Sequence, residues 1–173
     1  IAARFPGLHL RITEGFFEEL VLGMTRGDID VVVSNLPPGS VPPAVILKPL
    51  FNVRTEFVAG ATHPLAQRNN VTTADMRQAD WAIVKHPHIV SFLENFFASA
   101  SLPPLQVAVE TSSLATLKDL VLTGRFVAML PRLWIEEEIA SGDICVLRRE
   151  GGSLVRQAGL ITRGEDTQRP SIA

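Results

Sequence analysis

The chain has 173 residues, of which 46% are hydrophobic and 20% are charged, and it carries a formal net charge of −2 at pH 7. This length allows a sizeable core in one or two domains, and the composition is that of a soluble α/β protein. The slightly acidic balance excludes the basic face with which a segment of this kind would grip nucleic acid.

The cysteine count and the apolar runs of the sequence limit the cellular compartments that the chain could occupy. Cys145 has no second cysteine to pair with, which permits a reducing cytoplasm. We find no apolar run long enough for a membrane helix and no signal peptide. Residues 1–4 are expected to be the last turn of one helix and residues 169–173 the start of another, so we expect a piece of a longer protein.

The first elements along the chain are predicted to be a strand, a helix and a strand. Residues 8–12 alternate apolar and polar side chains, which predicts a strand with one buried face. Residues 17–24 repeat apolar side chains at helical spacing, and Gly27 suits the end of that helix. Residues 29–33 form a β-branched run, interrupted only by Asp30, that predicts a strand covered on both faces. This order predicts a right-handed βαβ unit with parallel strands.

The rest of the chain alternates between strand and helix patterns, which is typical of an α/β fold. Further extended segments are expected at 45–50, 55–61, 81–84, 105–109, 126–130, 144–147 and 155–162. Helices are expected to begin at Thr72 with Asp75 in its first turn, at Ser91, at Ser112 or Ser113, and at Pro131. Leu133 and Trp134 are expected to pack in the core.

Several short motifs follow one another in a specific order and spacing. They are Phe5-Pro6-Gly7-Leu8, Glu14-Gly15, Arg26-Gly27-Asp28-Ile29-Asp30, Ala61-Thr62-His63-Pro64-Leu65-Ala66, Glu110-Thr111-Ser112-Ser113-Leu114 and Gly124-Arg125-Phe126-Val127-Ala128-Met129-Leu130-Pro131. Together they resemble the effector-binding domain of LysR-type transcriptional regulators, over essentially the whole length of the chain.

The resemblance implies an α/β fold like that of type 2 periplasmic binding proteins. Two α/β subdomains would be joined by two crossing strands, with a ligand cleft between them. Subdomain I is expected at 1–56 plus 161–173, truncated at both ends, and subdomain II at 57–160. The family's first strand and its N-terminal winged helix-turn-helix, which contacts DNA, are expected to be absent from this chain.

An effector site is predicted where strands end and helices begin. Ligands of open α/β sheets bind outside the carboxyl ends of strands, and several helix N-termini at one edge favour an anion. A small carboxylate is therefore the expected effector. The candidate binding residues are Phe16, Phe17, Ser34, Asn35, Leu36, Arg54, Lys85, Pro87, His88, Ile89, Ser91, Thr111, Ser112 and Pro131.

Simpler interpretations of these residues stay open beside the binding hypothesis. The serines can be helix caps alone, and Lys85 and His88 can be solvated loop residues. Arg54 can form a hinge or surface ion pair. Phe17 can pack in the core, whereas a ring of Phe16 or Phe17 at the ligand would favour an effector with an apolar or aromatic body. His86 and His88 lack a third metal ligand, so neither a metal nor a cofactor is expected.

The function implied by the resemblance is effector sensing and dimerisation in a bacterial, cytoplasmic regulator. The effector would control DNA binding by the missing head domain, with no contact with a membrane. A homodimer is expected, or a tetramer at full length, with residues 9–13 against a helix at 91–100 and with Phe92 or Phe96 in the interface. The alternative is a solute-binding protein of a transport system. No enzymatic motif such as GxSxG, GxGxxG or HExxH is present, so catalysis is not expected.

Overall fold

The chain forms two compact units in a computed structural model that describes residues 4–36, 45–148 and 153–164. Unit 1 contains the described residues up to Phe51 and from Ala158 onwards, and unit 2 runs from Asn52 to Gln157. The predicted subdomain bounds at 56/57 and 160/161 stay a prediction. The helical turns expected at 1–4 and 169–173 lie, apart from Arg4, outside the described residues.

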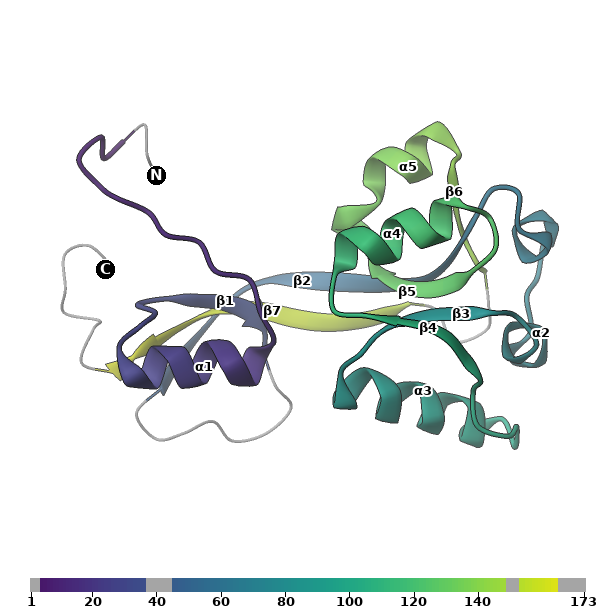
Figure 1. The fold of residues 1–173 in the computed structure, drawn as a ribbon, viewed down its shortest axis with the longest axis horizontal. Coiled ribbons are helices and arrows are strands. Elements are labelled where there is room, and N and C mark those ends of the chain that lie inside the picture. Colours follow the sequence, from purple (N-terminus) through teal and green to yellow (C-terminus); the bar gives the residue numbers. More distant parts are fainter. Residues whose placement is uncertain (1–3, 37–44, 149–152, 165–173) are drawn as a thin grey trace. The chain divides into compact units, whose positions relative to one another are not determined.

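Helices and strands alternate along the described residues, which confirms the predicted α/β class (Figure 1). The α-helices are α1 (Phe17–Arg26), α2 (Thr73–Arg77), α3 (Pro87–Ser99), α4 (Leu114–Leu122) and α5 (Glu136–Ser141), and the 3-10 helices are η1 (Pro64–Gln67) and η2 (Arg132–Trp134). The strands are β1 (Val32–Asn35), β2 (Val45–Gly60), β3 (Trp81–Val84), β4 (Val107–Thr111), β5 (Val127–Pro131), β6 (Ile144–Val146) and β7 (Leu154–Arg163).

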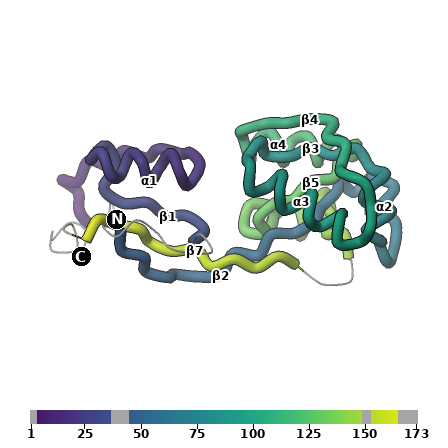
Figure 2. The backbone as a smooth tube through the Cα atoms, turned by 90° about the horizontal axis from the view of Figure 1, so that it is seen from below, coloured from purple at the N-terminus to yellow at the C-terminus, as the bar shows by residue number. Residues whose placement is uncertain are grey.

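Unit 1 packs the predicted helix α1 against a small antiparallel pair of strands. Helix α1 lies alongside β1 in both views (Figures 1 and 2). Strand β1 pairs with β7, where Val32 lies opposite Ile161, and both side chains are buried with Val21 and Met24 of α1. Helix α1 ends as predicted at Gly27, whose φ is +86°.

The predicted strand at 8–12 is wrong, because these residues form no ladder with any strand of the described chain. Leu8 and Leu10 are exposed and Ile12 is 86% exposed. Alternation predicts which side chains share a face, but a strand also needs a neighbour that accepts its hydrogen bonds. The expected parallel βαβ unit is therefore not formed by the described residues. Strand β1 also begins late, at Val32, and only one of its faces is covered, since Val33 is exposed.

Unit 2 is a mixed sheet with helices on both faces. Strand β3 runs parallel to β4 and β5, while β2 runs antiparallel to β5 and β6. Helix α3 covers one face and helices α4 and α5 cover the other (Figure 1). Successive side chains of each strand point to opposite faces of the sheet and pack in the two cores in turn. Phe57 therefore packs on the α3 side and Val58 on the α4 side.

Two helix starts in unit 2 differ from their predicted positions. Helix α3 begins at Pro87 because Nδ1 of His86 accepts a hydrogen bond from the His88 N–H (3.3 Å) and proline suits the first helical position. Ser91 is therefore an exposed residue within α3 and not its cap. The single helix expected from Pro131 to residue 140 is instead η2 followed by α5.

Smaller corrections concern strand bounds and exposure. The two extended segments expected at 45–50 and 55–61 form one strand, β2, and the strand expected at 105–109 is β4 at Val107–Thr111. Leu133 and Trp134 are exposed on η2, so their predicted burial is wrong. The turn of η2 places these two side chains outward, whereas Ile135 after them is fully buried in the α4-side core.

Candidate functional site

The carboxyl ends of three parallel strands meet at one edge of unit 2. Strands β3, β4 and β5 end at Val84, Thr111 and Pro131. We call this the carboxyl edge, and it consists of residues 84–88, 111–113 and 130–132 together with the segment of β2 that pairs with them. Helices α3 and α4 begin directly after β3 and β4, so their N-termini lie at this edge (Figure 1).

One row of side chains crosses the sheet at the carboxyl edge. Val84 pairs with Thr111, and Leu130 pairs with Glu56. Continuing the pairing of Trp81 with Val127 along the parallel strands brings Val84 level with Leu130. The alternation of each strand directs these side chains to the face that α4 covers. The sheet therefore aligns Glu56 and Thr111 on the face where α4 begins.

The N-terminus of α4 is organised by two hydroxyl groups. Oγ of Ser113 accepts a hydrogen bond from the Thr116 N–H (3.2 Å), and Oγ1 of Thr111 accepts one from the Ser113 N–H (3.1 Å). Of the two predicted caps, Ser113 is the one that caps α4. Ser112 is exposed between them and makes no hydrogen bond with the described residues, so its hydroxyl is available to solvent or a ligand.

Charged and aromatic groups surround the start of α3. Nζ of Lys85 lies 3.2 Å from Oε2 of Glu110, and both side chains are largely exposed. The Lys85 N–H also donates to the Thr111 carbonyl oxygen (2.9 Å), which ties the ends of β3 and β4 together. The rings of His86 and His88 lie 5.3 Å apart. The Lys85 ammonium is thus already beside a carboxylate, and an anionic ligand would share it with Glu110.

An ion pair at the carboxyl edge, in which only the carboxylate is buried, was not predicted from the sequence. Oε1 of Glu56 lies 3.7 Å from Nη1 of Arg132, and the two side chains are 5% and 40% exposed. The signal that could have identified Glu56 is an acidic residue directly before the apolar run from Phe57 to Ala59. Arg54, the residue that was predicted, lies two positions earlier on the same face of β2 and is exposed.

The candidate residues from unit 2 fall into three groups. Those at the carboxyl edge are Lys85, Pro87, His88, Thr111, Ser112 and Pro131. Ile89 packs partly against the α3-side core, and Ser91 is exposed one turn into α3. Arg54 is on β2, one residue before Thr55, which pairs with Pro131.

The other candidates belong to unit 1. Phe16 precedes α1, and its N–H donates to Oε2 of Glu19 (3.3 Å). Phe17 and Leu36 pack against the core of unit 1, as the simpler interpretation of Phe17 predicted. Ser34 and Asn35 are at the end of β1 and pair with Gly159 and Ala158 of β7.

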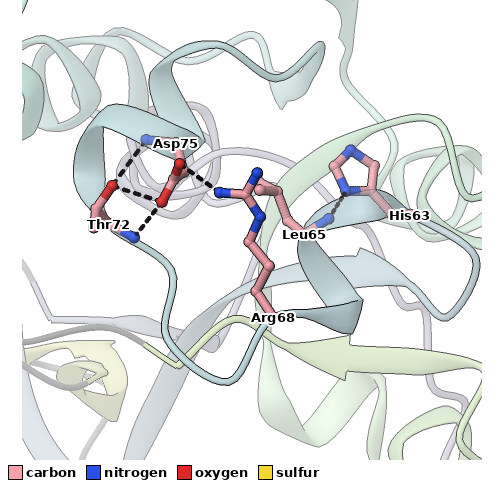
Figure 3. A network of polar contacts seen from close by, with 5 residues as sticks. All are labelled: His63, Leu65, Arg68, Thr72 and Asp75. Atoms are coloured by element: carbon pink, nitrogen blue, oxygen red, sulfur yellow. Dashed lines mark hydrogen bonds and ion pairs between the residues drawn. The ribbon is translucent and has the colours of Figure 1, made fainter.

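A second polar network involves His63, Leu65, Arg68, Thr72 and Asp75, and it gives the motif at 61–66 a structural role (Figure 3). Nδ1 of His63 accepts a hydrogen bond from the Leu65 N–H (3.0 Å) and so starts η1. Nη1 of Arg68 lies 2.6 Å from Oδ1 of Asp75 in the capping box of α2. Burial of His63 lowers its pKa, and the nearby charge of Asp80 opposes this effect only in part.

The described residues contain neither a metal cluster nor a membrane-spanning helix. No cluster of three or more histidine, cysteine, aspartate or glutamate residues with the geometry of a metal site is found among residues 4–36, 45–148 and 153–164. No helix in these ranges is both long and apolar enough to cross a membrane.

Comparison with known sequences identifies relatives over the whole chain. The family model described as LysR substrate binding domain matches residues 1–173. The transcriptional regulator GalR of Pseudomonas putida is 27% identical over 170 residues, which cover 98% of this chain and 43% of that protein. The chain spans about half the length of the curated relatives that it matches.

Solved structures share the fold. The regulatory domain of CcmR from Synechocystis, in complex with 2-PG, has a TM-score of 0.75 at 17% identity, covering 94% of this chain and 77% of that chain. The effector binding domain of QuiR, in complex with shikimate, has a TM-score of 0.69 at 14% identity, covering 87% of this chain and 69% of that chain. The predicted fold class is thereby confirmed as the mixed α/β fold of LysR regulatory domains, which is like that of type 2 periplasmic binding proteins.

Proposed function

The chain belongs to the LysR substrate-binding domain family, and we propose that it senses a small organic acid on behalf of a bacterial transcriptional regulator. The acid binds at the carboxyl edge of unit 2. Binding then alters how a DNA-binding head domain elsewhere in the protein engages its operator. The observation that carries this proposal is the convergence of two helix N-termini, α3 and α4, on the edge where β3, β4 and β5 end.

The preference for an acid follows from the backbone of those helices. The first N–H groups of a helix have no partner within it, and the helix dipole places partial positive charge there. The Ser113 side chain satisfies the N–H of Thr116, while the N–H groups of Leu114 and Ala115 have no acceptor among the described residues. A carboxylate can accept from these groups and from the Ser112 hydroxyl at the same time.

No covalent step is needed for this function. A ligand that binds one conformation of the protein better than another shifts the population toward that conformation. The size of this shift is set by the difference between the ligand's affinities for the two conformations. A ligand that binds both equally tightly would therefore not change DNA binding. The residues proposed to contact the acid directly are Ser112, Thr111 and Lys85, with His88 beside them.

Dimerisation through this chain is the second part of the proposal and comes from the family alone. The exposed face of α3, which includes Ser91, Glu94 and Asn95, is its proposed contact surface. Phe92 and Phe96 are half-buried against the core of their own unit, and the Phe96 ring lies 5.0 Å from that of Phe57. Sedimentation of a Glu94→Arg variant tests this surface, and an unchanged dimer would count against it.

Acid binding is tested by a ligand screen and by a variant that adds a negative charge at the carboxyl edge. Thermal melts of the 173-residue chain with a panel of aliphatic and aromatic carboxylates identify a ligand, because a ligand at a hundred times its dissociation constant adds about 2.7 kcal/mol of stability. Ser112→Asp is expected to weaken acid binding by roughly tenfold, since a second carboxylate beside the α4 N-terminus competes for the same N–H groups.

The matched control is Gln78→Glu, which adds the same charge just before β3, away from its carboxyl end. It should leave the dissociation constant of the acid unchanged. Acid binding that is equally strong in wild type and Ser112→Asp would remove the carboxyl edge as the site. If only neutral or cationic compounds stabilise the chain, the proposal that the effector is an acid is contradicted.

A further inference from the structure

Glu56 is a deeply buried carboxylate with too few partners. Its side chain is 5% exposed, and Oε1 pairs with Nη1 of Arg132 at 3.7 Å, a distance too long for a hydrogen bond. No group of the described residues donates a hydrogen bond to the Glu56 carboxylate. An ionised carboxylate can accept about four hydrogen bonds, and buried polar groups are nearly always satisfied.

The fold itself does not need a charge at this position. Glu56 lies on the face of β2 that also carries the buried Val58, and its paired residue in β5 is the buried Leu130. Both belong to an apolar core in which a valine or leucine at position 56 would pack without desolvating a charge. The carboxylate therefore raises the free energy of the folded chain unless something else compensates for it.

Arg132 connects the buried carboxylate with the surface. It is the first residue of η2, directly after the end of β5, and it is 40% exposed. The pair thus presents an acceptor and a donor side by side at the carboxyl edge. Glu56 stands in the same row of the sheet, and on the same face, as Thr111 at the start of α4, with Leu130 and Val84 between them.

We propose that Glu56 and Arg132 form a second binding element at the carboxyl edge, in which Glu56 accepts a hydrogen bond from a hydroxyl or ammonium group of the effector. This inference rests on the proposed acid-sensing function and narrows its ligand class. The acid group binds at the carboxyl edge, and the donor group beside it binds Glu56. A simple carboxylic acid leaves the buried carboxylate unsatisfied, so the effector is a hydroxy acid or an amino acid.

The first arm of the test needs no ligand. Glu56→Gln keeps the shape of the side chain and removes its charge, and the melting temperature of the variant is compared with that of the wild type. We expect it to be unchanged or higher, because the variant no longer buries an under-satisfied charge. A fall of more than about 3 °C would mean that the ion pair holds the fold together, and this overturns the inference.

The second arm measures discrimination between acids of one skeleton. The probes are phenylpropionate, phenyllactate and phenylalanine, and in parallel isocaproate, leucic acid and leucine, which differ by hydrogen, hydroxyl or ammonium beside the carboxylate. The wild type is expected to bind a hydroxyl or ammonium member about tenfold or more tightly than the unsubstituted acid of its set. In Glu56→Gln this preference should fall to less than about threefold.

Asp80→Asn is the matched control. It makes the same carboxylate-to-amide change in an exposed pair, 3.4 Å from Nε of Arg125, at the opposite ends of β3 and β5. This variant should have the melting temperature of the wild type and the same preference for the hydroxyl or ammonium member of each set. Equal binding of all three members of a set, or a preference that survives in Glu56→Gln, overturns this inference and leaves acid sensing intact. No binding of any of the six acids contradicts both proposals.

Discussion

Gly124 lies so close to Thr62 that a Cβ atom built on the glycine would be 1.9 Å from the threonine hydroxyl oxygen. The φ of Gly124 is also +74°, a conformation that side chains of L-residues rarely adopt. The two residues come from separate sequence motifs, the one before η1 and the one that leads into β5. Those motifs therefore meet in the structure, and the contact leaves no room for a side chain at position 124.

Replacement of Gly124 by alanine is expected to lower the free energy of unfolding by about 3 kcal/mol, from the left-handed backbone and from overpacking together. Urea denaturation measures the loss. Gly142→Ala is the matched control, since its φ is +86° but nothing lies within 4 Å of the added Cβ. It should cost only about 1 kcal/mol. Adding Thr62→Ala to Gly124→Ala should recover part of the loss, and equal losses at the two glycines would contradict the steric argument.

Burial of His63 predicts a stability that falls in mild acid. The pKa of the folded imidazole lies below its ordinary value of 6.5 because burial disfavours the charged form. The unfolded chain therefore binds the proton more readily than the folded chain. The contribution of His63 to stability is complete above pH 6.5 and is lost as the pH falls from there toward the folded pKa.

His63→Asn tests this, because the asparagine oxygen can still accept from the Leu65 N–H but does not titrate. The melting temperature of the variant should depend less on pH between about 7 and 5 than that of the wild type. His9→Asn, at an exposed position, should keep the slope of the wild type. A wild-type slope in His63→Asn would assign the pH dependence to other groups.

The capping box of α2 couples Thr72 to the ionisation of Asp75. The hydroxyl and the N–H of Thr72 both donate to the Asp75 carboxylate, and with Arg68 they hold the pKa of Asp75 below its ordinary value. Thr72→Ala should raise that pKa, as read from the carboxyl resonance in an NMR titration, and lower the melting temperature by roughly 3 °C. Thr116→Ala, an exposed threonine in α4, should change neither. An unchanged Asp75 titration in Thr72→Ala would rule out the coupling.

Arg163 joins the end of α1 to β7 within unit 1. Its Nη1 donates to the carbonyl oxygens of Met24 and Ile29, and Nη2 lies 3.5 Å from Oδ1 of Asp30. Arg163→Leu leaves two carbonyl groups without these donors, which should cost about 1–3 kcal/mol. Hydrogen exchange should speed up in α1 and β1 and stay unchanged in α4 and β5. Arg125→Leu, at an exposed position, should alter neither region, and uniform acceleration in Arg163→Leu would contradict a local role.

Several elements could be predicted because their signals are local. The stripe of apolar residues in α1, the glycine at position 27 and the Thr72–Asp75 box each act within one or two helical turns. The edge built from the ends of β3, β4 and β5 could also be anticipated, since parallel strands place their carboxyl ends together. The start of α3 was missed because a histidine, rather than the expected serine, accepts the capping hydrogen bond.

By itself the sequence determined the family, the α/β class and the helices whose signals are local. Tertiary structure alone decided which extended segments become strands, because a strand exists only where a neighbour accepts its hydrogen bonds. For that reason residues 8–12 stay outside any ladder among the described residues although they alternate well. It also decided that Glu56 is buried beside Arg132, since 76 positions separate the two in the chain and only the pairing of β2 with β5 brings them together.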